Sequence, residues 1–162
     1  MKWLTLTVLM FATQIAMASP NIGDQATYTG NAITNTGVVG MTLSKEILNY
    51  DHRTNTYLVK TDYHDDRGTF VTETEVVARR DLISAADGAA LMERCGDSEK
   101  QVKSSPAGEF ETCKIQKSEE GFTVHEWISA VPFGLVYRTE SIDEITYVDW
   151  RLLSFKIGEG IH

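Results

Sequence analysis

Apolar and polar residues alternate with a period of two through much of this chain, and this alternation limits the fold more than any other feature. Successive side chains of a β-strand point to opposite faces of a sheet, so the pattern predicts strands with one buried face. Short polar segments at residues 51–55 and 64–68 separate three such stretches. Because antiparallel neighbours can be joined by short turns, the pattern predicts an antiparallel meander.

One segment has a different pattern and predicts a short helix. Residues 81–95 are rich in alanine, and Ser84 followed by Asp87 resembles a capping box. Gly88 within the segment is unfavourable for a helix. The predicted fold class is mainly β, an antiparallel meander forming a strongly curved sheet or incomplete barrel with one short helix. The strands are expected at residues 25–29, 39–50, 57–63, 70–78, 101–103, 109–117, 122–130, 133–140 and 145–156, with a loop at 31–37.

The first eighteen residues resemble a cleavable secretory signal peptide. Lys2 precedes an apolar run from Trp3 through Ala12, and small residues occupy the −3 and −1 positions of a cleavage site after Ala18. A membrane anchor needs roughly 20 apolar residues, and polar residues at 13 and 14 end this run too early. We expect residues 1–18 to be removed and residues 19–162 to form a single β-rich domain. The expected location is periplasmic or secreted, with no integral membrane segment after cleavage.

The net charge limits the classes of partner. Removal of Lys2 with the signal changes the formal net charge from −8 to −9. An acidic domain of this kind is poorly suited to binding nucleic acid or anionic lipid surfaces through bulk electrostatics. We therefore expect no nucleic-acid partner.

The chain has two cysteines, Cys95 and Cys113. In an exported protein they can form one intramolecular disulfide, which would close a loop of about 19 residues and stabilise the fold by about 3 kcal/mol. Two free buried thiols or an intermolecular bridge are the alternatives. The spacing excludes a C-x-x-C redox site, so a bridge would be structural.

The residue types that usually carry catalysis do not form a recognisable motif. His64, Asp65 and Asp66 are adjacent, but a turn is favoured over a metal site because no second cluster lies at ligand spacing. His125 has no nucleophile motif near it, and the paired glutamates fit solvated strand faces better than an acid–base pair. The Gly-x-Ser-x-Gly, P-loop and HExxH patterns are absent from the sequence. The sequence thus predicts no metal and no cofactor, and an enzyme is the less favoured class.

Aromatic residues are concentrated in the last forty residues of the chain. They either line a hydrophobic cavity or groove, or fill the core of a curved sheet. The predicted ligand contacts are Trp127, Phe133, Tyr137 and Trp150, and Tyr147 and Phe155 belong to the same aromatic set.

Two motifs carry a resemblance to a known group of proteins. The segment 106–114 reads PAGEFETCK and the segment 124–140 reads VHEWISAVPFGLVYRTE. They resemble the PAGxFxTCK and VPFGLV motifs of small exported envelope β proteins of Gram-negative bacteria, whose function is uncharacterised. In that group an earlier cysteine often partners the Thr-Cys strand, as Cys95 would here. The strand order is more distantly similar to the half-barrel of the periplasmic lipoprotein carrier and its receptor, which hold acyl chains in a concavity.

Two hypotheses for function follow. The first is a periplasmic non-enzymatic binding or carrier module for an apolar ligand, such as a lipid, or for a lipid-modified partner. The second is an envelope structural or protein-interaction domain that acts through a sheet edge or an acidic face.

Overall fold

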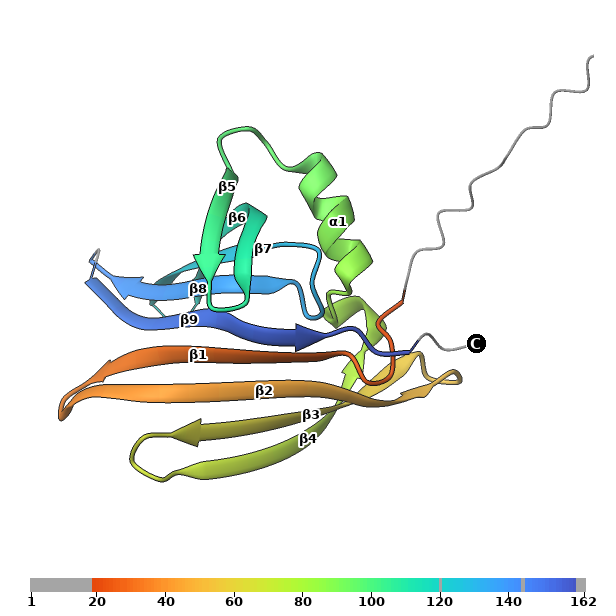
Figure 1. Cartoon of the computed structure of the whole chain (residues 1–162), viewed down its shortest axis with the longest axis horizontal. Helices are drawn as coiled ribbons and strands as arrows, with labels where there is room; N and C mark the ends of the chain where they lie inside the picture. Colours follow the sequence, from red (N-terminus) through yellow and green to blue (C-terminus); the bar gives the residue numbers. More distant parts are fainter. Residues whose placement is uncertain (1–18, 120, 144, 160–162) are drawn as a thin grey trace, which may run out of the picture.

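The computed structural model describes residues 19–159 except 120 and 144, so the expected signal lies outside the described residues. The described strands are β1 (Gln25–Thr34), β2 (Gly37–Asp51), β3 (Thr56–Asp65), β4 (Phe70–Ala78), β5 (Lys100–Ser105), β6 (Gly108–Glu119), β7 (Phe122–Ile128), β8 (Leu135–Ile142) and β9 (Ile145–Lys156). They form one antiparallel sheet in the order β4-β3-β2-β1-β9-β8-β7-β6-β5 (Figure 1). Its edge strands β4 and β5 do not pair, so the sheet is open. The predicted mainly β fold class, with one short helix in the described residues, is confirmed.

The sheet consists of two meanders, β1–β4 and β5–β9, which meet along β1 and β9. In the second meander β5 contacts β8 and β9, although β6 and β7 separate them in the sheet. The backbone N–H of Ala107, in the β5–β6 turn, donates to the carbonyl of Leu152 on β9 at 3.2 Å. The second meander is therefore strongly curled, and Figure 1 shows β5 folded back over its neighbours.

The first hairpin differs from the prediction. β1 continues to Thr34 and β2 begins at Gly37, so the expected loop at 31–37 is wrong and most of it is strand. Ile33 pairs with Val38 across the hairpin, and Gly37 has a φ of 117°, which glycine tolerates best. Pairing with neighbouring strands decides the conformation here, although Asn, Thr and Gly favour a loop when considered alone.

The helix α1 spans Ala85–Arg94, within the predicted segment, and a 3-10 turn η1 at Arg79–Asp81 precedes it. Ser84 caps the helix, because its Oγ accepts the backbone N–H of Asp87 at 3.1 Å. The Asp87 carboxylate in turn accepts the Ser84 backbone N–H at 2.8 Å, which completes a capping box. At Gly88 a Cβ would lie 2.1 Å from the Ser129 carbonyl oxygen. The glycine that weakened the helix prediction therefore allows α1 to approach the chain just after β7.

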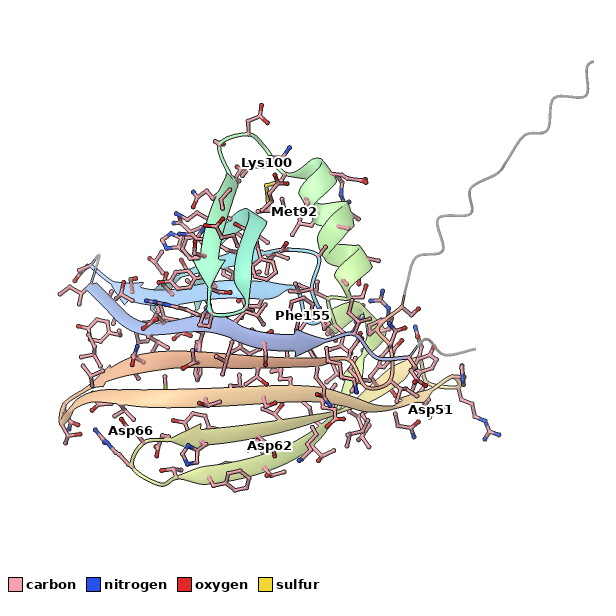
Figure 2. All side chains as sticks on the ribbon, in the orientation of Figure 1. Asp51, Asp62, Asp66, Met92, Lys100 and Phe155 are labelled. Carbon is pink, nitrogen blue, oxygen red and sulfur yellow. A yellow bond between two sulfur atoms is a disulfide. The ribbon has the colours of Figure 1, made fainter. Side chains whose placement is uncertain are left out.

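In the structure Cys95 and Cys113 form a disulfide. Cys95 is the C-terminal cap of α1, and Cys113 is buried in β6. The sulfur atoms lie near Met92 of α1 and Lys100 of β5 (Figure 2). The bridge therefore fixes the end of the helix to the second meander.

Two clusters of buried side chains form the core, and Phe133 packs against both of them. Phe133 lies in the turn between β7 and β8, so this turn closes over the core. The first cluster contains Ala26, Tyr28, Val131, Val136 and Leu152. The second contains Ile47, Tyr57, Val59 and Leu82.

Candidate ligand-binding trough

The four aromatic residues that were predicted as ligand contacts lie in two pairs on opposite faces of the sheet. Trp127 on β7 pairs with Tyr137 on β8, which pairs with Arg151 on β9. Trp150 precedes Arg151 in the same strand, so its side chain points to the other face. Phe133 and Trp150 line one cavity, which Trp127 and Tyr137 do not line. The predicted set therefore does not form one site.

The first face carries a row of two aromatic side chains flanked by two cationic ones, which we call the ladder. One residue comes from each of β6, β7, β8 and β9: Lys114, Trp127, Tyr137 and Arg151. The ring centroids of Trp127 and Tyr137 are 5.0 Å apart. Lys103 of β5 lies over the row, with its Nζ 4.1 Å from the Trp127 centroid and 5.3 Å from that of Tyr137. These distances allow cation–π attraction, which holds the curled β5 against β8.

Protein side chains already cover the Trp127 ring of the ladder. Trp127 is 6% exposed, and its indole N–H donates to Oε1 of Gln101 at 2.8 Å. Burial, together with the nearby positive charge of Lys114, lowers the pKa of Lys103. The same two causes lower the pKa of His125, whose ring lies next to Trp127. The ladder is thus a crowded, cationic contact in which the Trp127 ring is covered by protein side chains.

The opposite face carries a trough of about 400 Å³, within the range typical of small-molecule sites. It crosses the middle of the sheet, since its lining residues come from β1, β2, β7, β8 and β9 and from the segments before α1 and β8. The apolar and aromatic lining residues are Tyr28, Leu43, Ile83, Ile128, Phe133, Leu135 and Trp150. These side chains can bury an apolar group of a ligand.

The turn between β7 and β8 positions Phe133 over the trough. Pro132 is buried, and Phe133 and Gly134 follow with φ angles of 62° and 72°. A Cβ at Gly134 would lie 2.6 Å from Cγ2 of Ile83, so only glycine fits between these segments. Residues 129–134 form this turn. The strand predicted at 122–130 therefore ends at Ile128, and the strand predicted at 133–140 begins at Leu135.

Four charged residues complete the lining: Lys45, Glu126, Arg138 and Glu140. Arg138 forms ion pairs with Glu126 and with Glu140, the latter at 2.9 Å. Lys45 lies on β2 beyond Leu43, at the other side of the trough. The sequence prediction missed all four. Lys45 could have been found, because it occupies an inward position of the apolar alternation Val39, Met41, Leu43 and Ile47.

The motif at His64–Asp66 lies at the tip of the β3–β4 hairpin. The turn predicted at 64–68 begins only at Asp66, because His64 and Asp65 still belong to β3 and His64 pairs with Phe70. The Asp65 carboxylate accepts the backbone N–H groups of Thr69 and Arg67 at 2.8 and 3.0 Å. The hydrogen bond from Thr69 is the largest of the causes that lower the pKa of Asp65. Asp66 accepts the backbone N–H of Gly40 at 3.0 Å. Both carboxylates therefore accept backbone N–H groups, that of Asp65 within the hairpin and that of Asp66 from β2.

The described residues contain neither a cluster of metal-ligating side chains nor a helix of membrane-spanning length. No group of three or more His, Cys, Asp or Glu side chains in residues 19–159, leaving out 120 and 144, is placed to hold a metal ion. No helix in the same part of the chain is long and apolar enough to cross a membrane.

A second cleft, of about 460 Å³, lies between α1 and β5. Met92 and Lys100 mark its two sides (Figure 2). Its lining also includes Glu93, Gln101, Val102 and Glu111, and most of its surface is apolar. The trough is the preferred candidate site because it is more enclosed and three aromatic side chains line it, whereas no described aromatic residue lines the second cleft.

Two solved structures share this fold. A protein from Bacteroides fragilis, inferred to be exported and with a YmcC-like fold, matches with a TM-score of 0.51 and 13% identity. A protein from Parabacteroides distasonis, inferred to be a lipoprotein, matches with a TM-score of 0.50 and 13% identity. Each match covers 86% of this chain and 98% of the other. No protein-family model and no curated protein sequence matches the chain, so the resemblance based on the two motifs stays a prediction.

Proposed function

We propose that this protein is a periplasmic, non-enzymatic binding or carrier module that holds an apolar ligand in the trough. The observation that supports the proposal most is the continuous lining of Leu43, Ile128, Phe133, Leu135 and Trp150 around about 400 Å³. Burial of apolar surface stabilises a complex by roughly 25 cal/mol per Å², so such a lining favours an acyl chain or another apolar group. A lipid or the lipid of a modified protein would supply it.

The proposed location is the periplasm. Residues 1–18 have the pattern of a cleavable signal, and the two structural neighbours are described as an exported protein and a lipoprotein. Mass measurement of the protein purified from the envelope tests this directly. A mature protein that begins at Ser19 supports it, whereas a retained Met1 contradicts it.

Binding can be tested by titration of the purified protein with a fluorescent fatty acid. Leu43→Trp should fill the trough and weaken binding at least tenfold, since Leu43 lies on its floor. Val38→Trp is the matched control, because Val38 also lies on β2, is 66% exposed and lines neither the trough nor the second cleft. Thermal unfolding of both variants verifies that they are folded. The proposal is wrong if the wild type does not bind, or if both variants bind equally well.

One observation favours the second hypothesis, an interaction through a sheet edge. β4 is an edge strand that exposes Phe70 (66%) and Val76 (69%), and an edge strand can add a strand from a partner. Val76→Lys should then reduce capture of envelope proteins, while Val102→Lys on the other edge strand should not. Capture that disappears at high salt would instead indicate contact through the acidic face.

A further inference from the structure

The most informative group in the trough is the hydroxyl of Tyr28. Tyr28 lines the trough with only 2% of its surface exposed, and no described residue hydrogen-bonds its hydroxyl. Every fully enclosed polar side-chain atom of the described chain does have a partner. The Tyr28 hydroxyl is therefore not fully enclosed, and it reaches the trough. Burial raises the pKa of Tyr28, so the hydroxyl stays protonated and can donate a hydrogen bond.

Lys45 lies close to Tyr28 on the adjacent strand. Tyr28 pairs with Leu43, and Lys45 is two residues further along β2 on the same face. Such diagonal neighbours are about 7–8 Å apart between their Cα atoms, within reach of a lysine side chain. Both residues line the trough. The hydroxyl and the ammonium group can therefore contact the same atom of a ligand.

The charge of Lys45 is not neutralised by a carboxylate in the described part of the chain, where it has neither an ion pair nor a side-chain hydrogen bond. The other lysine on this part of the sheet, Lys60, pairs with Asp62 at 2.8 Å. Across the trough, Glu126 and Glu140 are paired with Arg138. Lys117 also pairs with Glu126, at 3.3 Å, so these two glutamates are neutralised within the protein. The charge of Lys45 is therefore left to attract an anionic group of a ligand.

We propose that the trough binds an amphiphile with an anionic head, held by Lys45 and Tyr28, and an apolar chain along the floor towards Trp150. This inference rests on the proposed function and specifies the chemical class of the ligand. A carboxylate and a phosphate head have the same anionic chemistry here, and each can accept a hydrogen bond from the Tyr28 hydroxyl while it contacts the Lys45 ammonium group.

The test compares three probes with the same alkyl chain: dodecanoate, dodecyl phosphate and the neutral dodecanol. Calorimetric titration of the wild type should show at least tenfold tighter binding of one or both anions than of dodecanol. The anion that binds more tightly distinguishes a carboxylate head from a phosphate head. If all three bind alike, the inference is wrong while the proposed function stands. If none binds, both are wrong.

Two variants test whether Lys45 and Tyr28 cause the preference for an anionic probe over dodecanol. Lys45→Met and Tyr28→Phe keep most of each side chain, so thermal unfolding should change little. Each should reduce the preference for the anion at least threefold, and the double variant should remove it. Lys60→Met is the matched control, because Lys60 pairs in register with Glu46, on the other face of the sheet from Lys45. A preference that survives the double variant, or that Lys60→Met reduces as much, overturns the assignment of the head to Lys45 and Tyr28.

Discussion

The two tryptophans of the second meander lie on opposite faces of the sheet in very different surroundings. Trp127 is 6% exposed, and the ammonium group of Lys103 covers its ring. Trp150 is half-buried and borders the open volume of the trough. Both residues belong to one aromatic segment of the sequence, yet one stabilises the curl of the sheet while the other faces a cavity.

The charged neighbours differ in the same way. At the ladder the lysines contact aromatic rings, and at the trough Arg138 contacts carboxylates. Lys45 has neither kind of partner in the described residues. The aromatic content of the segment therefore does not distinguish the two faces, whereas the protein partners of the rings and of the neighbouring charges do.

Substitution of each tryptophan by alanine should have the largest effect and should separate the two faces. Trp127→Ala removes a buried ring and its hydrogen bond to Gln101, and we expect a loss of about 3–5 kcal/mol in the free energy of unfolding. Trp150→Ala should cost less, about 1–3 kcal/mol, because open space already adjoins the ring. Urea unfolding at pH 7 measures both values. Equal costs, or a larger cost at Trp150, would contradict the distinction between the faces.

Removal of the disulfide should have the next largest effect. The bridge joins Cys95 of the helix to Cys113, which precedes the ladder residue Lys114 in β6. Closing a loop of this length stabilises a fold by about 3 kcal/mol. The double variant Cys95→Ala/Cys113→Ala should therefore lose about that much free energy of unfolding, as measured by urea unfolding. Mass measurement after alkylation gives an independent check. Both cysteines should react only after reduction, and reaction without reductant would mean that the protein has no such bridge.

The sequence predicted best those elements that local patterns determine. The strands at 70–78 and 145–156 have the bounds that were predicted, because polar turn residues limit each apolar stretch. The helix was predicted from alanine content and from the Ser84–Asp87 cap, both of which are local signals. The expected loop at 31–37 failed because pairing with two neighbouring strands outweighs the local preference of Asn and Thr.

The division of the aromatic residues between two faces could not be predicted from the alternation alone. Within one strand the alternation shows which residues share a face, but between strands the face depends on register. Bulges interrupt the register between Trp127 and Ile128 and again between Glu140 and Ser141. The position of Lys103 depends on the curl of the whole meander, which no local pattern encodes. Lys45 is different, because its inward position was visible in the sequence.

The smallest expected effect is the pH dependence of the ladder. Burial and the charge of Lys114 lower the pKa of Lys103 below its ordinary value of 10.5. Between the lowered pKa and 10.5 the unfolded chain binds more protons than the folded chain at this residue, so this residue makes stability rise with pH. Below that range the charged Lys103 disfavours the folded state, and cation–π attraction of about 0.5–1 kcal/mol opposes this cost.

Lys103→Met removes the titrating group but keeps an apolar side chain over Trp127. As pH rises from 7 towards 10.5, the wild type should therefore become more stable relative to this variant. Lys103→Arg stays charged over this range and should show the same loss of pH dependence. Urea unfolding at closely spaced pH values measures these differences. All variants share the other titrating groups, so the contributions of those groups cancel to first order. A constant difference would show that Lys103 is not crowded in the ladder, and the contrast between a filled face and an open trough would then rest on Trp127 alone.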